Sequence, residues 1–190
     1  MQIGAGQQNS AENRQYLIGL GANLPSPHGP PLATLVAALA ALEARNVRVL
    51  ARSPWFESEP VPRSEQAWFV NAAALVGTLE SPHNLLKILH EIEIDFGRAR
   101  SVPNAARPLD LDLLLGTGLV LDRPPDDGSG GVDLSGRALV LPHPRLAERA
   151  FVLRPLAAIA PDWVHPRTGR SLARMAAELP DGPMVRLLGA

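Results

Sequence analysis

The chain has 190 residues, of which 46% are hydrophobic and 19% are charged, and its formal net charge is −1. This balance predicts one globular domain with a real core and excludes a disordered chain. The charge argues against nucleic-acid binding driven by bulk charge, and the absence of cysteine excludes a disulfide scaffold, a thiolate metal site and a cysteine nucleophile.

The first residues differ in composition from the rest of the chain. Residues 1–14 are rich in Gln, Asn, Gly and Ala and lack the apolar core of a signal peptide. We therefore expect a disordered tail, followed by a single domain over residues 15–190. No apolar run reaches the roughly 18 residues that a membrane helix requires, so we expect no membrane contact and a cytoplasmic location.

The first half of the domain predicts a strand, a helix and a second strand. Residues 16–21 form a short apolar run that ends in glycine, which is typical of a strand. Apolar residues recur at helical spacing over residues 32–45, and apolar and polar residues alternate over residues 47–55. Residues 57–67 contain two prolines and are expected to form a loop.

A third strand, a second helix and a fourth strand follow. Residues 68–78 are rich in the aromatic and β-branched types that favour strands. Ser81 and Pro82 suit the N-cap and the first position of a helix, and Gly97 suits its end. An arginine-rich loop then leads into a leucine-rich strand that ends at Leu115.

The pattern weakens beyond this strand. Residues 119–121 predict a short strand, and residues 122–136, rich in Pro, Gly and Asp, predict a flexible loop. Residues 144–149 predict a short helix, and residues 151–159 are apolar. The tail beyond Ser171 is expected to end in a helix.

The order strand-helix-strand-strand-helix-strand over residues 16–115 predicts a ferredoxin-like α+β fold with a βαββαβ core. We expect an antiparallel sheet with both helices packed on one face, and a C-terminal β/α extension. The other face of the sheet would then be free for a site.

Two aspartates alternate with leucines in the last strand of this core. Because residues i and i+2 of a strand point to the same face, Asp110 and Asp112 share one face and the flanking leucines share the other. Their Cα atoms would be roughly 6.5–7 Å apart, from a rise of about 3.3 Å per residue. Carboxylates at this spacing suit one or two Mg²⁺ ions whose coordination is completed by water and phosphate.

Three arginines, Arg98, Arg100 and Arg107, lie close to these acids in the sequence. Guanidinium groups bind phosphate oxygens bidentately and keep their proton. The acids and arginines together therefore predict a polyphosphate site. The alternative is a structural cluster of salt bridges, in which the arginines only neutralise the aspartates.

Several motifs occur along the chain in a fixed order. Residues 96–100 (Phe-Gly-Arg-Ala-Arg) are followed by residues 107–112 (Arg-Pro-Leu-Asp-Leu-Asp). Further motifs occur at a predicted strand end (residues 19–24), in a loop with the strand that follows it (residues 53–73), and in a later segment (residues 141–156). Together they resemble the 6-hydroxymethyl-7,8-dihydropterin pyrophosphokinase family, whose members act in folate biosynthesis.

The resemblance implies transfer of a pyrophosphoryl group from ATP to the hydroxymethyl group of the pterin, with release of AMP. It implies that Asp110 and Asp112 hold two Mg²⁺ ions on the ATP phosphates. It also implies that Arg98 and Arg100 belong to a catalytic loop that closes on the triphosphate and excludes water. The implied ATP-binding residues are Glu93, Arg98, Arg100, Arg107, His143 and Arg149.

The resemblance also implies a set of pterin-binding residues. These are Ser58, Glu59, Val61, Phe69, Asn71 and Phe151. Asn71 offers a donor and an acceptor to the amide edge of the ring, and the two phenylalanines offer stacking partners. Without the resemblance, the alternatives are core packing for the phenylalanines, a turn or cap role for Asn71 and a plain surface position for His143.

Two other functions stay open at this point. Nucleotidyltransferases also bind Mg²⁺ with an Asp-x-Asp strand, but they place a Gly-Ser turn where this chain carries arginines. A ferredoxin-like RNA-binding module is disfavoured by an aromatic content of only 4% and by the lack of an Arg/Lys–Gly–aromatic motif. We therefore expect a monomer that binds ATP and hydroxymethyl-dihydropterin and no nucleic acid, with association with other folate enzymes as a further option.

Overall fold

A computed structural model describes residues 14–98, 105–122, 138–180 and 182–189. Nearly all of the predicted N-terminal tail and of the loop predicted at residues 122–136 lies outside the described residues. Within the described part of the chain, no helix is long and apolar enough to cross a membrane.

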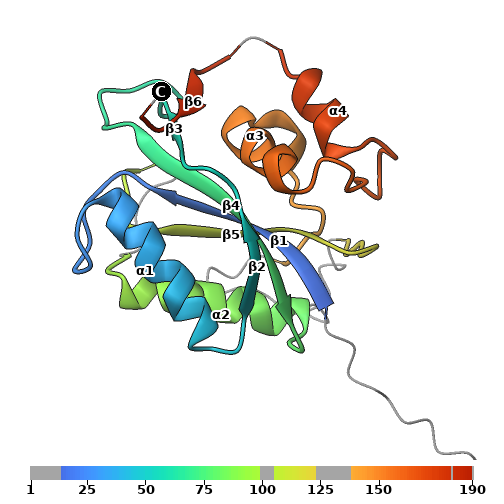
Figure 1. Ribbon diagram of the computed structural model, residues 1–190, viewed down its shortest axis with the longest axis horizontal. Coiled ribbons are helices and arrows are strands. Elements are labelled where there is room, and N and C mark those ends of the chain that lie inside the picture. Colours follow the sequence, from blue (N-terminus) through green and yellow to red (C-terminus); the bar gives the residue numbers. More distant parts are fainter. Residues whose placement is uncertain (1–13, 99–104, 123–137, 181, 190) are drawn as a thin grey trace, which may run out of the picture.

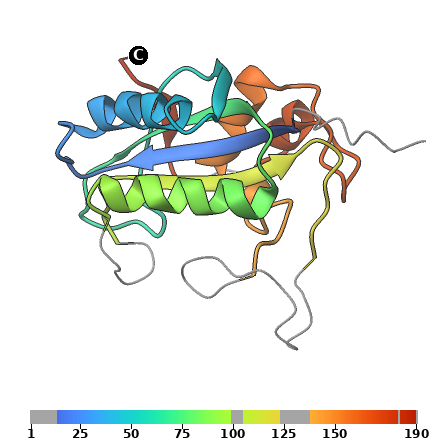
Figure 2. The same cartoon turned by 90° about the horizontal axis from the view of Figure 1, so that it is seen from below.

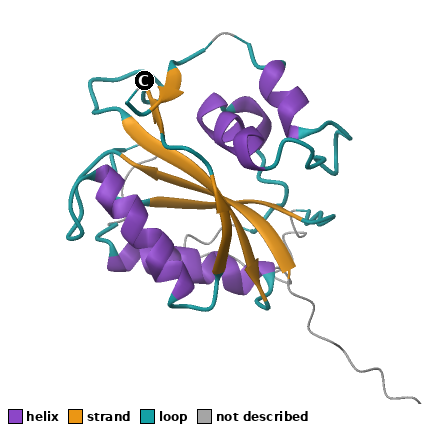
Figure 3. Cartoon of the chain, viewed as in Figure 1, coloured by secondary structure: helices purple, strands orange, loops and turns teal. Residues whose placement is uncertain are grey.

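The sheet has six strands, and every neighbouring pair is antiparallel (Figure 3). The strands are β1 (Arg14–Ala22), β2 (Arg48–Arg52), β3 (Phe56–Ser58), β4 (Phe69–Thr78), β5 (Asp110–Gly116) and β6 (Val185–Leu187). β1 lies between β5 and β4, and the far edge of β4 pairs with both β2 and β3. β6 extends the sheet on the other side of β3. β5 therefore forms one edge of the sheet.

Two helices, α1 (Pro31–Glu43) and α2 (Pro82–Asp95), cover one face of the sheet and run side by side along it (Figure 2). Ser81 is the N-cap of α2, and its side chain accepts the N–H of Asn84 at 3.2 Å. Just after α2, Gly97 adopts the left-handed conformation, with φ of 87°, that often follows a helix. This order of elements confirms the predicted ferredoxin-like α+β fold. The core under the helices includes Ile18, Leu20, Leu35, Leu42, Ala74, Leu89, Ile92 and Leu111.

The C-terminal extension covers part of the opposite face. It contains one 3₁₀ turn, η1 (Leu146–Glu148), and the helices α3 (Ala150–Ile159) and α4 (Leu172–Ala177). Figure 1 shows α3 and α4 on the side of the sheet away from α1 and α2. The prediction that this face is free is therefore wrong in part, because α3 buries its apolar side there. This second core includes Leu17, Ala73, Leu114, Leu115, Leu153, Leu156 and Met175.

Some short elements differ from the prediction. β3 occupies the first residues of the loop expected at 57–67, and the chain ends in the strand β6 rather than in a helix. Three residues are too few to show a period, and both strands form because β4 offers an edge for pairing. The helix expected at residues 144–149 is the single turn η1, and the strand expected at 119–121 contributes one bridge between Leu121 and Leu141.

Candidate active site

The acid pair lies on the edge strand β5, with its side chains on the face opposite α1 and α2. Leu109, Leu111 and Leu113 are buried in the core beneath those helices. Asp110 and Asp112 point the other way, as the alternation predicts, and their side chains are 26% and 33% exposed. A ligand above this face can therefore reach both carboxylates.

Two glycines of β1 leave space beside the acids. In the β1–β5 register, Gly19 is opposite Asp112 and Gly21 is opposite Asp110. A Cβ atom at either glycine would lie 3.8 Å from the Cβ of its aspartate. The glycines form part of a small pocket that is open to solvent. The pocket is lined by Gly19, Leu20, Gly21, Asn71, Ala72, Ala73, Asp110, Asp112, Leu114, Phe151 and Val152.

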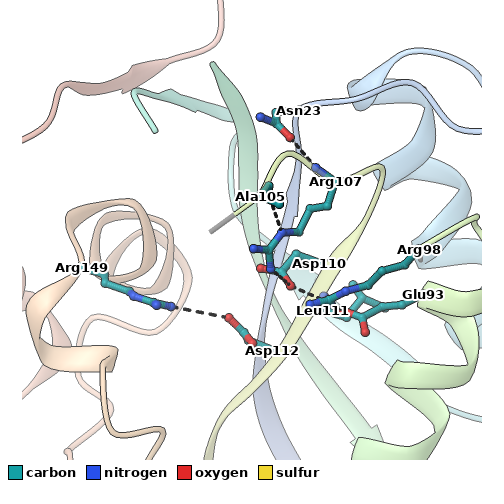
Figure 4. A network of polar contacts seen from close by, with 9 residues as sticks. All are labelled: Asn23, Glu93, Arg98, Ala105, Arg107, Asp110, Leu111, Asp112 and Arg149. Atoms are coloured by element: carbon teal, nitrogen blue, oxygen red, sulfur yellow. Dashed lines mark hydrogen bonds and ion pairs between the residues drawn. The ribbon is translucent and has the colours of Figure 1, made fainter. Parts of the chain in front are cut away.

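Asp110 is held by two arginines from different segments (Figure 4). Its Oδ1 accepts hydrogen bonds from Nη1 of Arg98 at 2.8 Å and from Nη1 of Arg107 at 2.9 Å. Arg107 is fixed in turn, because its backbone N–H donates to Asn23 Oδ1 at 2.8 Å and its Nε donates to the carbonyl of Ala105 at 3.1 Å. The arginines therefore flank the acid pair in a defined position.

Glu93 connects α2 to the strand that carries the acids. Its Oε1 accepts the backbone N–H of Leu111 at 2.7 Å and also an Nη1 hydrogen of Arg98. The residue is only 3% exposed. Burial raises the pKa of Glu93 to about 8, and this effect outweighs the opposing charge of Arg98. The carboxylate thus faces the strand, and direct contact with a ligand would require it to move.

Asp112 has a looser partner. Arg149, which precedes α3, approaches it with 3.9 Å between Nη1 and Oδ2, from the side opposite Glu93 (Figure 4). Although a third of its side chain is exposed, loss of hydration, followed by the charge of Asp110, raises the pKa of Asp112 to about 7. The Nε atom of Arg149 is buried and has no hydrogen-bond partner among the described residues. Arg149 therefore has hydrogen-bonding capacity left for an anion.

His143 lies beside the end of the acid strand. Its backbone N–H donates to the carbonyl of Leu114 at 2.8 Å, and its Nδ1 accepts the N–H of Arg145 at 3.2 Å. Burial, followed by the charges of Arg149 and Arg145, lowers the pKa of His143 to about 4. The ring is therefore neutral at physiological pH.

The residues predicted to bind the pterin are only partly gathered at the pocket. Asn71 and Phe151 line it, and Ser58 is next to it because its Oγ accepts Nδ2 of Asn71 at 2.9 Å. Glu59 is turned toward the C-terminal strand, where its carboxylate accepts the N–H of Met184 at 3.0 Å. Val61 and Phe69 do not belong to the pocket lining. Of the remaining predicted residues, Arg100 lies outside the described residues.

Asn23 is a residue of the site to which the sequence assigned no role. Besides accepting the N–H of Arg107, it donates its own N–H to the carbonyl of Arg107 at 3.1 Å. Its Nδ2 donates to the carbonyl of Ala67 at 3.1 Å. Asn23 thus joins the arginine loop to the segment before β4. An Asn directly after a strand can indicate a residue that joins two loops. The sequence alone does not identify its partners, because they are distant along the chain.

Comparison with known proteins identifies the family. Residues 17–161 match the family model described as 7,8-dihydro-6-hydroxymethylpterin-pyrophosphokinase (HPPK). The chain belongs to the HPPK family. This confirms the family resemblance of the sequence motifs, and it favours the first of the three functions weighed above.

Two similar proteins are named as pyrophosphokinases of this kind, and a third is named as a folic acid synthesis protein. The chain is 40% identical over 152 residues to a 2-amino-4-hydroxy-6-hydroxymethyldihydropteridine pyrophosphokinase of Methylorubrum extorquens, covering 80% of this chain and 85% of the relative. It is 37% identical over 178 residues to the enzyme of that name from Pseudomonas aeruginosa, covering 93% and 99%. It is also 34% identical over 166 residues to the folic acid synthesis protein fol1 of Pneumocystis carinii. That match covers 87% of this chain but only 20% of fol1.

Solved structures show the same HPPK fold. An HPPK-DHPS triple mutant of Plasmodium falciparum superposes with a TM-score of 0.67 at 13% sequence identity. The match covers 90% of this chain and 45% of the Plasmodium chain. The HPPK chain described here thus spans less than half of that two-part protein.

Proposed function

We propose that this HPPK chain transfers a pyrophosphoryl group from ATP to 6-hydroxymethyl-7,8-dihydropterin, giving AMP and the pterin diphosphate in folate biosynthesis. One observation carries the proposal: two carboxylates on a strand, flanked by three arginines, open onto a pocket that also contains Asn71. The acids and arginines suit a triphosphate with its metal ions, and the pocket suits a flat ring beside it.

The donor set at the acid pair fits Mg²⁺. The ion pair of Asp112 with Arg149 is long, at 3.9 Å, and the pKa of Asp112 is raised mainly by burial and then by the charge of Asp110. Within the described residues there is no group of three or more His, Cys, Asp or Glu that could hold an ion. Mg²⁺ usually binds one or two carboxylates and completes its shell with water and phosphate oxygens, so the acid pair could hold it without a third protein ligand. When bound, two such ions would offset the charge of the phosphates and favour an in-line displacement.

The arginines would bind and orient the phosphates. In the proposed reaction, the pterin hydroxyl oxygen forms a bond to the β-phosphorus of ATP as the bond from that phosphorus to the α,β-bridging oxygen breaks. The electron pair of the broken bond leaves with AMP, and the hydroxyl proton is released to solvent. Arg98, Arg107 and Arg149 would stabilise the charge on the transferred group, since phosphoryl transfer depends mostly on positioning and electrostatics. Arg100, which lies outside the described residues, is proposed to bind the triphosphate with them.

The pterin would bind between β4 and α3. We propose that Asn71 hydrogen-bonds the amide edge of the ring and that Phe151 lies against its face, with backbone groups near residues 58–61 completing the contacts. The hydroxymethyl group would then point toward the acid pair, which lines the same pocket.

Product analysis tests the proposal. The purified protein is incubated with ATP, Mg²⁺ and 6-hydroxymethyl-7,8-dihydropterin, and the nucleotide products are separated. AMP without free pyrophosphate is the expected result, whereas release of pyrophosphate would indicate nucleotidyl transfer instead. The Asn71→Ala variant should weaken pterin binding and hardly change ATP binding; equal losses for both ligands would contradict the proposed role.

Some relatives support a further proposal about partners. An Arabidopsis thaliana relative, 34% identical over 142 residues, is named a bifunctional folate synthesis protein. We propose that this chain acts as a monomer that associates with another enzyme of the same pathway.

A further inference from the structure

The turn between β1 and α1 is closed on itself and tied to α1. Ser26 and Gly29 exchange two backbone hydrogen bonds, at 2.9 and 3.0 Å, and Pro27 with His28 forms the tip between them. Ser26 Oγ accepts the backbone N–H of His28 at 3.0 Å and lies 2.8 Å from Thr34 Oγ1. Thr34, a fully buried residue of α1, donates in turn to the carbonyl of Gly29 at 3.1 Å. The tip is therefore fixed to the helix layer.

This tip lies against the end of α2. The imidazole ring of His28 stacks on the ring of Phe96, with 4.1 Å between the ring centroids and 26° between the planes. Phe96 is only 4% exposed, whereas His28 is at the surface. A Cβ atom at Gly97 would lie 3.8 Å from Cδ of Pro27, so the proline is next to that glycine. The turn thus covers the two residues that end the helix.

The end of α2 is a Schellman motif that leads directly into Arg98. The N–H of Gly97 donates to the carbonyl of Ile94 at 3.0 Å, and the N–H of Arg98 donates to the carbonyl of Glu93 at 2.9 Å. From this backbone position the side chain of Arg98 reaches Asp110, at 2.8 Å. The conformation at the helix end therefore sets the point from which Arg98 extends toward the acid pair.

This backbone anchor would matter most when ligands are bound. Asp110 is one of the two acids proposed to hold Mg²⁺, so in that complex it would be less available to Arg98. Phe96 precedes Arg98 by two residues, and a shift of its ring would move the backbone between them. Helix ends fray readily, and removal of the His28 ring would expose one side of Phe96 to water. Arg98 would then spend less time in its place beside the phosphates.

We propose that His28 is a positioning residue for Arg98. By stacking on Phe96, it holds the end of α2 in the conformation that presents Arg98 to the triphosphate. This proposal rests on the proposed pyrophosphokinase function and adds a residue to it. The role requires a flat ring at position 28, and it requires neither a charge nor a hydrogen bond from that ring.

A double-mutant cycle tests this role. In His28→Ala, kcat and the affinity for a non-hydrolysable ATP analogue with Mg²⁺ should each fall by about three- to tenfold, the scale of one aromatic contact. The affinity for 6-hydroxymethylpterin should stay the same, because Arg98 is not among the residues proposed to bind the ring. In the Arg98→Ala background, His28→Ala should have little further effect on either quantity, since its effect passes through the arginine.

Two further variants sharpen the test. His28→Phe keeps a ring that can stack on Phe96 and should recover most of the loss. His83 is an exposed histidine in the first turn of α2, roughly 20 Å from Arg98 at about 1.5 Å per residue of helix. His83→Ala should therefore leave kcat and both affinities unchanged. Circular dichroism checks that each variant is folded, and the affinity for the ATP analogue, measured by calorimetry, extends the cycle to variants with little turnover.

The outcomes are distinguishable. Failure of the wild type to form AMP would refute the proposed function, and this role with it. An active wild type whose kcat and ATP-analogue affinity are both unchanged in His28→Ala would overturn the positioning role alone. Equal losses in the wild-type and Arg98→Ala backgrounds would overturn it as well, and so would a loss in His28→Phe as large as that in His28→Ala.

Discussion

The carboxylate of Glu93 accepts the backbone N–H of Leu111 at 2.7 Å, and Leu111 lies between the two aspartates of the site. The same oxygen accepts Arg98, which in turn donates to Asp110. One buried side chain of α2 therefore positions the acid strand and one of its arginines together.

Removal of this carboxylate should impair turnover. Glu93→Ala would leave the Leu111 N–H and Arg98 without their acceptor, and we expect kcat to fall by about 10- to 100-fold, the scale of a small misplacement in an active site. Glu93→Gln should lose less, because the amide oxygen can still accept the N–H of Leu111. Steady-state kinetics of the two variants measure the difference.

Asp95 offers a control on the same helix. Its carboxylate pairs with Arg45 at 2.6 Å and is more than half exposed. Asp95→Asn should behave as the wild type. If Glu93→Ala, shown to be folded by circular dichroism, also kept wild-type kcat, Glu93 would have no positioning role.

Asp112→Asn should abolish both turnover and stabilisation by Mg²⁺. The neutral amide would weaken the proposed metal site, and we expect kcat to fall by at least about 100-fold. The wild type should gain thermal stability when Mg²⁺ and a non-hydrolysable ATP analogue are added together, because ligands that bind only the folded chain stabilise it. A comparable gain in Asp112→Asn would remove Asp112 from the metal site; Asp122→Asn, at the surface, is the control.

Arg149→Ala should weaken ATP binding more than pterin binding. The buried Nε of Arg149 has no hydrogen-bond partner among the described residues, so it can donate to a ligand. A hydrogen bond between charged groups contributes about 1.5–3 kcal/mol to the free energy of binding. We therefore expect an ATP analogue to bind about 10- to 100-fold more weakly, as measured by calorimetry. Arg167→Ala, which breaks an exposed ion pair with Asp122, should change nothing. Equal effects of the two substitutions would argue against a specific phosphate contact at Arg149.

The stability of the metal-free protein should fall as the pH rises toward 8. The pKa of Glu93 is raised from 4.5 to about 8 and that of Asp112 from 3.8 to about 7. An acid with a raised pKa binds its proton more tightly when folded, so its contribution to the free energy of unfolding is complete below the ordinary pKa. That contribution is lost as the pH passes the raised value.

Urea unfolding from pH 6.5 to pH 8 isolates this effect. The lowered pKa of His143, from 6.5 to about 4, acts in the opposite sense: its contribution is present above pH 6.5 and is lost as the pH falls through 4. Glu93→Gln cannot ionise and should show a smaller decline than the wild type. The same decline in both proteins would mean that Glu93 is already charged in the fold.

Much of the fold followed from local patterns. The periods of α1, α2 and the long strands, together with Ser81 and Gly97 at the ends of α2, were enough to predict the βαββαβ order. β3 and β6 could not be predicted, because each has three residues and forms only where another strand offers an edge. The sequence also did not predict that α3 covers part of the sheet face opposite α1 and α2, because no local pattern indicates where a helix will pack.

The sequence by itself determined the chemistry of the site. Two carboxylates alternating with leucines must share a face of a strand, and the nearby arginines predict either a bound anion or a cluster of salt bridges with those acids. The tertiary structure alone decided that Gly19 and Gly21 lie opposite those acids and that Glu93 accepts the backbone N–H of Leu111 between them. It also decided that Ser58 and Asn71 are hydrogen-bonded. These relationships depend on strand register and helix packing between residues far apart in the chain. Register follows from burying whole faces at once, so no single segment contains it.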